Sequence, residues 1–153
     1  MSSETLQTRE ITEADAEVVA QFVWRLLDEL SDGAAPEQAD VLAVAHRTLL
    51  LETVTGLLAY SGEVPVGLMM LNECAAIYAG GRFAEISELY VEPELRSHGV
   101  AASLVHDAIE LGKARDWQRL EVGAPDQPAW KRTFDFYLGN GFAEVGPRLR
   151  RLI

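Results

Sequence analysis

A run between residues 83 and 113 joins a predicted strand to a predicted helix through a glycine turn, and it limits what the chain can fold into. Residues 83–91 include Phe, Ile, Tyr and Val and end shortly before Pro93, which cannot donate to a strand ladder. Apolar residues then recur with helical spacing from Val100 to Leu111, which predicts a helix over residues 100–113. The chain is therefore expected to combine a β-sheet with packed helices.

The turn itself, over residues 96–101, combines the free backbone N–H groups of a helix start with the positive end of the helix dipole. Such a site binds anions, and a phosphate is its usual ligand. Gly99 lets the backbone approach a ligand closely, Ala101 adds little bulk, and Arg96 can supply a cation. A strand, a glycine turn and a helix also fit a simple connection, so the motif alone is not specific.

A second signal lies about forty residues further on. Arg96-x-x-Gly99-x-Ala101, which follows ELYV, resembles the acetyl-CoA loop of the GCN5-related N-acetyltransferase superfamily. The run FYLGNGF over residues 136–142 is similar to the FYxxxGF signature of that superfamily. Two signatures in the right order are far more specific than either one. The resemblance is clear over residues 64–142 and fainter in the N-terminal third.

The resemblance implies acetyl-CoA as the cosubstrate and indicates where it binds. In the superfamily, two parallel central strands splay apart, and the pantetheine arm pairs with backbone groups in the gap. The corresponding strands here are residues 83–91 and 119–123. The implied cofactor-binding residues are Leu89, Tyr90 and Val91 for the arm, and Arg96, Ser97, His98, Gly99, Val100 and Ala101 for the pyrophosphate.

Aminolysis of a thioester needs a base, because an ammonium group is not a nucleophile. Glu85, Glu88 and Glu121 lie on the two strands that flank the expected gap. Strand alternation puts Glu85 and Glu88 on opposite faces, so we expect only one of them to face the site. The resemblance favours Glu85, which lies in a FAEI setting, or Glu121, in LEV, and our order is Glu85, Glu88, Glu121. Each could instead face solvent or pair with an arginine.

The departing thiolate needs a proton or a hydrogen bond, and Tyr137 matches the superfamily's usual donor in FYxxxGF. The alternative is that Tyr137 only packs beside Phe134 and Phe136. A strand N–H near residues 89–91 would stabilise charge on the carbonyl oxygen. One departure is that Trp130 and Thr133 stand where many members have Asn and Ala. The contact that this Asn makes with the cofactor arm is therefore in doubt.

The fold class expected is α/β: a mixed, mostly antiparallel sheet with helices on both faces, in one domain over residues 1–153. A Thr12 cap with Asp15 at its third position begins the first helix, and Gly33 ends it. In the superfamily, the first two helices form much of the acceptor pocket. The predicted order βααβββαβαββ uses strands at residues 5–11, 57–61, 64–71 and onward to 78, 83–91, 119–123, 142–145 and 148–152, helices up to 30 and at 35–52, 100–113 and 130–138, and a loop at 124–128.

Composition narrows the partners. A net charge of −11 argues against nucleic acid, which clustered Lys and Arg would bind. No apolar run approaches a membrane span, and the N-terminus does not resemble a signal peptide, so we expect a cytoplasmic protein. The single cysteine, Cys74, fits that compartment and is expected to be a small apolar residue rather than a nucleophile. The histidines are scattered, so no metal is expected. Three arginines on the last predicted strand, Arg148, Arg150 and Arg151, suit a protected edge or a homodimer contact.

These observations predict an acetyl-CoA-dependent N-acetyltransferase that moves the acetyl group directly to a primary amine of a small molecule or peptide. The excess of carboxylates, 24 against 13 Lys and Arg, favours a cationic acceptor. One alternative is a non-catalytic acyl-CoA-binding or regulatory module, in which the phosphate loop is present but no acid and base are paired. Another is an α/β protein that binds nucleotides without acyl transfer.

Overall fold

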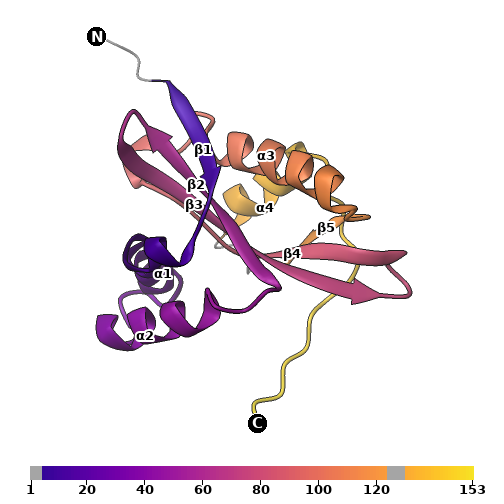
Figure 1. Cartoon of the computed structure of the whole chain (residues 1–153), viewed down its shortest axis with the longest axis horizontal. Coiled ribbons are helices and arrows are strands. Elements are labelled where there is room, and N and C mark those ends of the chain that lie inside the picture. The colour runs from indigo at the N-terminus through magenta and orange to yellow at the C-terminus, as the bar shows by residue number, and fades with distance from the viewer. Residues whose placement is uncertain (1–4, 124–129) are drawn as a thin grey trace. The chain divides into compact units, whose positions relative to one another are not determined.

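The computed structural model of the chain describes residues 5–123 and 130–153, so the loop predicted over residues 124–128 lies outside the described residues (Figure 1). Residues up to Glu121 form one compact unit, and residues from Val122 onward form a second, smaller one. The helices and strands, in chain order, are β1 Leu6–Glu10, the 3-10 helix Glu13–Asp15, α1 Ala16–Leu30, α2 Gln38–Thr48, β2 Val54–Ser61, β3 Val64–Ala76, β4 Gly81–Val91, the 3-10 helix Pro93–Leu95, α3 Val100–Arg115, β5 Leu120–Val122 and α4 Lys131–Gly139.

The sheet has five strands in the order β1-β2-β3-β4-β5, and the first four pair antiparallel with their neighbours. On the β5 side, the Gln118 N–H donates to the Arg82 carbonyl at 2.8 Å and the Ala84 N–H donates to the Arg119 carbonyl at 3.2 Å. Residue numbers increase in the same direction on both sides of this pair of bonds, so β4 and the segment that leads into β5 run parallel. This is the arrangement expected for strands joined by a crossover helix. The predicted mixed, mostly antiparallel sheet is confirmed.

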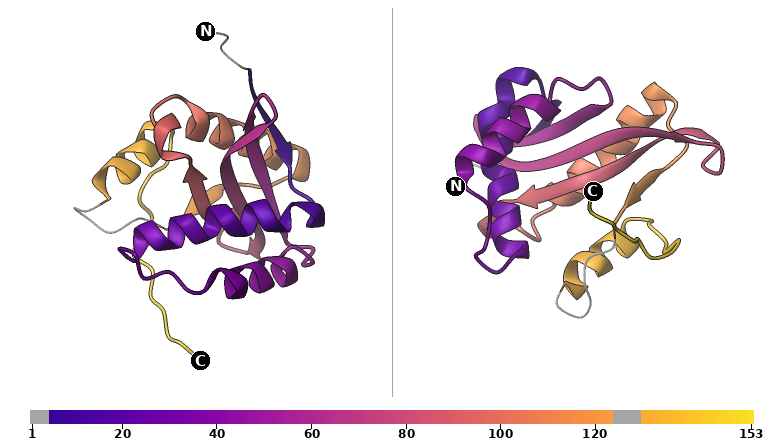
Figure 2. Two further views of the ribbon diagram at one scale, coloured as in Figure 1. Left: turned by 90° about the vertical axis from the view of Figure 1, so that its left-hand side faces the viewer. Right: turned by 90° about the horizontal axis from the view of Figure 1, so that it is seen from below.

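Helices cover both faces of this sheet. Val19 and Phe22 of α1 pack with Leu58, Leu68 and Tyr90 on one face, where α1 and α2 lie across the strands (Figure 2). α3 packs on the other face, and it lies so close that a Cβ at residue 67 would be 2.9 Å from a methyl group of Val100. A glycine is therefore required there. Five large side chains are almost completely buried, each worth about 1.5–3 kcal/mol of burial: Leu58, Leu68, Met69, Leu71 and Leu104.

The predicted cap is present, but it begins the 3-10 helix Glu13–Asp15, which leads directly into α1. The Thr12 side chain accepts from the Ala14 N–H at 3.3 Å, and the Asp15 carboxylate accepts from the Thr12 N–H at 2.7 Å. Arg9 adds two hydrogen bonds to the Asp15 carboxylate, at 2.9 and 2.7 Å. These bonds lower the pKa of Asp15 below its ordinary value, and the hydrogen bond from Arg9 has the largest effect. Asp15 therefore joins β1 to the start of α1.

Asp15→Ala is expected to lower the free energy of unfolding by about 1–2 kcal/mol at neutral pH, because it removes the cap and the Arg9 pair together. A lowered pKa in the folded protein stabilises it above the pKa of the unfolded chain, and this contribution disappears as the pH falls through the folded value. The difference from wild type should thus be constant above about pH 5 and shrink below about pH 4. Urea unfolding across this range measures it. Glu13→Ala, at an exposed neighbour, is the control and should show neither effect.

The second helix and the two terminal strands differ from the prediction. The second helix runs over Gln38–Thr48 rather than residues 35–52, and Pro36 lies outside it, with its carbonyl accepting a hydrogen bond from the Trp24 indole at 2.8 Å. The two terminal strands do not form, and residues 142–153 have no regular secondary structure. Their short apolar patterns fit a strand, but a strand also needs a partner edge, and Leu149 is 94% exposed. The homodimer stays a prediction. The strand of C-terminal arginines on which it was based does not form.

Candidate active site

A β-bulge interrupts β4 at the point where its glutamates lie. The pairing of β3 with β4 shifts between Met70 and Leu71: Met70 is opposite Glu88, whereas Leu71 is opposite Ile86. One extra residue, Ser87, is thus accommodated in β4. The strict alternation of side chains that the sequence predicted breaks down at this residue.

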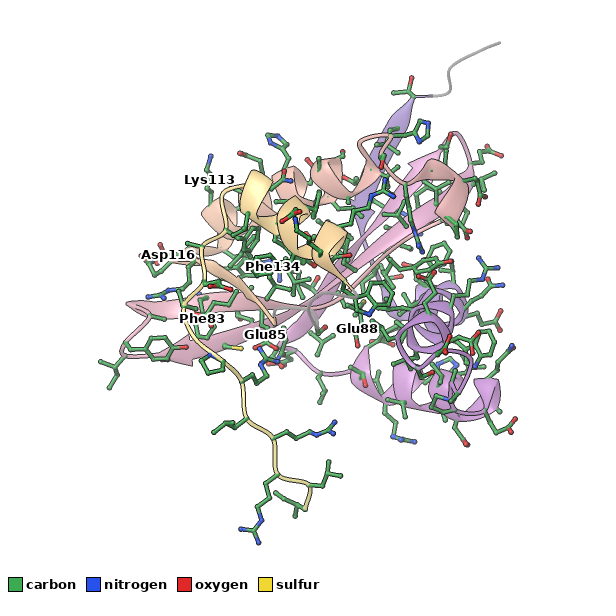
Figure 3. All side chains as sticks on the ribbon, turned by 180° about the vertical axis from the view of Figure 1, so that it is seen from behind. Phe83, Glu85, Glu88, Lys113, Asp116 and Phe134 are labelled. Carbon is green, nitrogen blue, oxygen red and sulfur yellow. The ribbon has the colours of Figure 1, made fainter. Side chains whose placement is uncertain are left out.

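The bulge places Glu85 and Glu88 on the same face of the sheet. Glu85 is opposite Asn72 and Glu88 is opposite Met70, and these two partners share a face because they are two residues apart on β3. Met70 belongs to the core beneath α1, so this is the face that α1 and α2 cover. Figure 3 shows both glutamates projecting from the same side of the sheet. The expectation that only one of them could face a site is wrong, since the extra residue restores the face that alternation would have changed.

A pocket of about 560 Å³ lies between α1, α2 and the bulge. Its wall on the sheet side is made by Val54, Met70, Leu71, Asn72, Ser87 and Glu88. The Ser87 hydroxyl donates a hydrogen bond to the Glu88 carboxylate, which orients that side chain. Glu88 thus contributes a partly buried carboxylate to a mostly apolar pocket. Glu85 lies on the same face but is not part of the described wall.

The other candidate base, Glu121, has an arginine partner. Its carboxylate lies 3.5 Å from the guanidinium of Arg119, which in turn lies over the Tyr78 ring at 5.5 Å. Desolvation raises the pKa of the Cys74 thiol, and the negative charges of Glu85 and Glu121 raise it further. The thiol is therefore protonated at neutral pH, which fits the expectation that Cys74 is not a nucleophile.

The phosphate loop has the backbone geometry of an anion site. Gly99 caps the N-terminus of α3 in the left-handed conformation, with φ 88°, and Ser97 also has a positive φ, of 68°. No side chain caps the helix, and its first turn contains no acidic residue. A Cβ at residue 99 would meet no atom within 4 Å. An anion can therefore approach the first N–H groups of α3 from open space.

Arg96 is held by the protein itself. Its Nε donates to the Val91 carbonyl at 2.9 Å, and its two terminal nitrogens bond to the Glu29 carboxylate at 3.1 and 2.5 Å. The hydrogen bond with Glu29 raises the pKa of Arg96, and the guanidinium also lies over the Tyr90 ring at 5.4 Å. Arg96 thus ties the loop to α1 and to the end of β4.

Sequence reasoning did not single out Glu29. This residue lies four positions after Arg25, so the two form one charged stripe on α1. Arg25 pairs with Glu92 just after β4, and Glu29 pairs with Arg96. The sequence shows these two charged residues at helical spacing beside the apolar stripe of α1, and this was the signal that could have identified them. The partner of each is 67 residues away in the chain, so spacing could not identify the partners.

The strand residues predicted to bind the cofactor arm lie at the end of β4. Leu89, Tyr90 and Val91 are opposite Met69, Leu68 and Gly67, respectively. Tyr90 is buried, and its ring lies 5.4 Å from that of Phe22. On the β5 side, the bonds described above reach β4 near its start, at Arg82 and Ala84. His98 is exposed in the loop, and its ring Nδ1 lies 2.9 Å from the Arg96 carbonyl.

The second unit contains the FYLGNGF run, which forms the end of α4. Gly141 has φ 92°, its N–H donates to the Leu138 carbonyl at 3.3 Å, and the Phe142 N–H donates to the Tyr137 carbonyl at 3.1 Å. These two bonds define a Schellman motif, whose hydrophobic contact is the Phe142 ring at 5.3 Å from the Tyr137 ring. The signature is thus a helix stop that fixes Tyr137. Phe136 also contacts this ring, at 5.4 Å.

Burial raises the pKa of Tyr137 to about 12. The phenol is therefore neutral at physiological pH and keeps the proton that a general acid needs. The buried, aromatic surroundings fit the packing role as well, so the two interpretations of Tyr137 require a mutation to separate them. Trp130, where many superfamily members have Asn, is the residue before α4 and makes no side-chain hydrogen bond that caps it.

The described residues contain no cluster of three or more His, Cys, Asp or Glu side chains that could hold a metal ion. Within the same part of the chain, none of the helices has the length and hydropathy needed to span a bilayer.

Gly99→Asp is expected to weaken acetyl-CoA binding about ten- to a hundredfold. Aspartate tolerates a left-handed backbone and would cap the N–H groups of α3, so it should occupy the anion site without unfolding the protein. Its charge would also repel a phosphate, and losing one charged hydrogen bond has an effect of this order. Isothermal titration calorimetry measures the change, with melting temperature as the folding check. Gly99→Asn, which caps without the charge, should lose less affinity, and an unchanged Kd for Gly99→Asp contradicts the loop assignment.

Comparison with known proteins agrees with this geometry. The sequence model of the Acetyltransferase (GNAT) family matches residues 20–137. A sequence search of curated proteins found no match. Among solved structures, a proposed acetyltransferase from Arthrobacter sp. FB24 is 27% identical, with a TM-score of 0.77 over 100% of this chain and 99% of that one.

Two further structures share the fold at lower identity. A ribosomal-protein-alanine N-acetyltransferase from Brucella melitensis biovar Abortus 2308 is 18% identical, with a TM-score of 0.75 over 97% of this chain and 99% of that one. An aminoglycoside N-acetyltransferase in complex with CoA is 14% identical, with a TM-score of 0.77 over 99% of this chain and 97% of that one. The family match spans more than half of the sequence and includes the glycine loop, the bulged strand and Tyr137. The chain belongs to the Acetyltransferase (GNAT) family.

Proposed function

We propose that the protein is an acetyl-CoA-dependent N-acetyltransferase that transfers the acetyl group directly to a primary amine. The observation that carries the proposal is the pocket between α1, α2 and the β4 bulge, because Glu88 is one of its lining residues. A carboxylate inside an apolar pocket can both attract an ammonium group and accept its proton. The structural relatives described above include enzymes named for acetylating an amine of a protein and of an aminoglycoside, which supports an amine acceptor.

The residues present fit acetyl-CoA. The uncapped start of α3, together with the loop from Arg96 to Ala101, offers backbone N–H groups to the pyrophosphate, and the space at Gly99 is open. Leu89, Tyr90 and Val91 would offer backbone groups to the pantetheine arm. When bound, acetyl-CoA supplies an acetyl group activated as a thioester. Arg96 acts chiefly by holding the loop, since its guanidinium already bonds to Glu29 and Val91.

The proton transfers are assigned to two groups. Glu88 is the proposed base, because it lines the pocket and the Ser87 hydroxyl bonds to its carboxylate. Glu85 comes second because it shares the face, and Glu121 comes third because Arg119 neutralises it. Tyr137 is the proposed acid for the departing thiolate, and its raised pKa keeps it protonated. A backbone N–H at the end of β4 would stabilise the charge that develops on the carbonyl oxygen.

The proposal also includes the whole chain working as one domain, a cytoplasmic location, no nucleic-acid or membrane partner, and no metal. The negative net charge supports the exclusion of nucleic acid. A homodimer remains a prediction, which the sedimentation coefficient in solution would test.

The deciding experiment measures release of free thiol from acetyl-CoA in the presence of a panel of primary amines. An N-acetyltransferase releases thiol in proportion to acetylated amine. A binding module instead retains affinity for acetyl-CoA, measured by calorimetry, but releases no thiol with any amine. A nucleotide-binding protein without acyl transfer would bind adenine nucleotides as tightly as acetyl-CoA.

A further inference from the structure

We propose that the acceptor is a primary amine carried on an apolar hydrocarbon body of several carbons, rather than on a sugar or a peptide backbone. The inference rests on the proposed function and concerns the same pocket. It starts from what the walls are made of. Apolar side chains form most of the lining, and those from α1 and α2 include Val19, Val23, Leu27, Val41 and Val44.

The charged residues of the described wall are Asp40 and Glu88, and both are acidic. Glu88 is partly buried at the sheet end, whereas Asp40 is exposed in the first turn of α2. A cationic group thus has one carboxylate inside the pocket, and a carboxylate of a substrate would be repelled. This distribution orients the amine toward β4 and leaves the rest of the molecule against the aliphatic wall.

The aliphatic wall discriminates between acceptor bodies. Each methylene that leaves water for such a wall increases binding about fourfold. A sugar hydroxyl or a peptide N–H placed against the aliphatic side chains would lose its water without gaining a partner, and each such group weakens binding about five- to a hundredfold. Besides the two carboxylates, the lining side chains that could replace this water are those of Thr48, Asn72 and Ser87. The pocket volume of about 560 Å³ is in the range of sites for small molecules. The walls therefore favour an alkyl or arylalkyl amine.

The test uses two amines with the same number of heavy atoms, hexylamine and 2-(2-aminoethoxy)ethanol. Both present one ammonium group, and only the body differs in polarity. We expect kcat/KM for thiol release to be at least about tenfold higher with hexylamine, and to rise about fourfold per methylene from butylamine to hexylamine. Calorimetric titration of each amine into the protein saturated with CoA should show the same order of affinity.

A charge placed on the wall provides the matched variant. Val44 lines the pocket and is 50% exposed, so Val44→Glu should fold, and it should reduce the preference for hexylamine about tenfold because the alkyl chain would desolvate a carboxylate. Val64→Glu makes the same change at a residue that is 60% exposed and does not line the pocket, and it should leave the preference unchanged.

The outcomes separate this inference from the proposed function. Thiol release that is equal or faster with the ether alcohol, or with glucosamine, overturns the hydrocarbon acceptor and leaves the transferase in place. Preferential binding of hexylamine without thiol release from any amine supports the pocket's specificity and overturns the transferase. Equal binding of the two matched amines contradicts the inference whether or not turnover occurs.

Discussion

Glu88→Gln is expected to lower kcat about a hundred- to ten-thousandfold while changing the Kd for acetyl-CoA little. Glutamine keeps the size of the side chain and can still bond to the Ser87 hydroxyl, but it cannot take a proton from an ammonium group. A correctly placed base contributes a factor of this order. The measurement is the initial rate of thiol release at saturating acetyl-CoA and amine.

The pH dependence adds a second readout. With a carboxylate base, the rate falls at low pH as the carboxylate becomes protonated, and Glu88→Gln should remove this acidic limb along with most of the rate. Glu85→Gln is the matched control, because it makes the same change on the same face but outside the described wall of the pocket. Should Glu85→Gln remove the limb while Glu88→Gln retains it, the base is Glu85, which the family resemblance favours. Loss of the limb only in Glu121→Gln would move the role to β5.

Tyr137→Phe is expected to lower kcat about ten- to a thousandfold, with a smaller effect on acetyl-CoA affinity. The substitution deletes one hydroxyl and keeps the ring that packs between Phe136 and Phe142. Losing a proton donor to the thiolate has an effect of this order. Single-turnover rates of thiol release, measured together with the Kd for acetyl-CoA, separate the two effects.

Leaving-group chemistry distinguishes an acid from a packing residue. A more acidic thiol leaves as the thiolate without needing the proton. With an aryl thioester of the acetyl group, Tyr137→Phe should therefore lower the rate less than it does with acetyl-CoA.

Because burial raises the pKa of Tyr137 to about 12, the folded protein holds this proton more tightly than the unfolded chain, whose tyrosine titrates near pH 10. The resulting stability is present below about pH 10 and lost as the pH rises toward 12, and Tyr137→Phe should not show that loss. An unchanged kcat would leave Tyr137 as a packing residue only.

Local patterns in the sequence determined the elements and the family. The apolar spacing from Val100 predicted α3, the Thr12 and Asp15 pair predicted the cap that leads into the first helix, and the glycine of the loop predicted open space beside the start of α3. Each of these depends on residues within a few positions of each other, where spacing and backbone preference are sufficient. The two signatures, over residues 96–101 and 136–142, by themselves indicated the GNAT family, and the family match agrees.

Tertiary structure alone decided which glutamates share a face, what holds Arg96, and whether the last residues form strands. The bulge at Ser87 has no glycine to mark it, and it appears only because β3 pairs with β4 on both sides of it. Glu29 reaches Arg96 across 67 residues of sequence, and no local pattern records that contact. The terminal segments have apolar residues but form no ladder, since a strand is stable only where another strand supplies its hydrogen bonds. In the first two cases the deciding partner is distant in the chain, so only folding brings the two together; in the third, the described sheet supplies no partner strand.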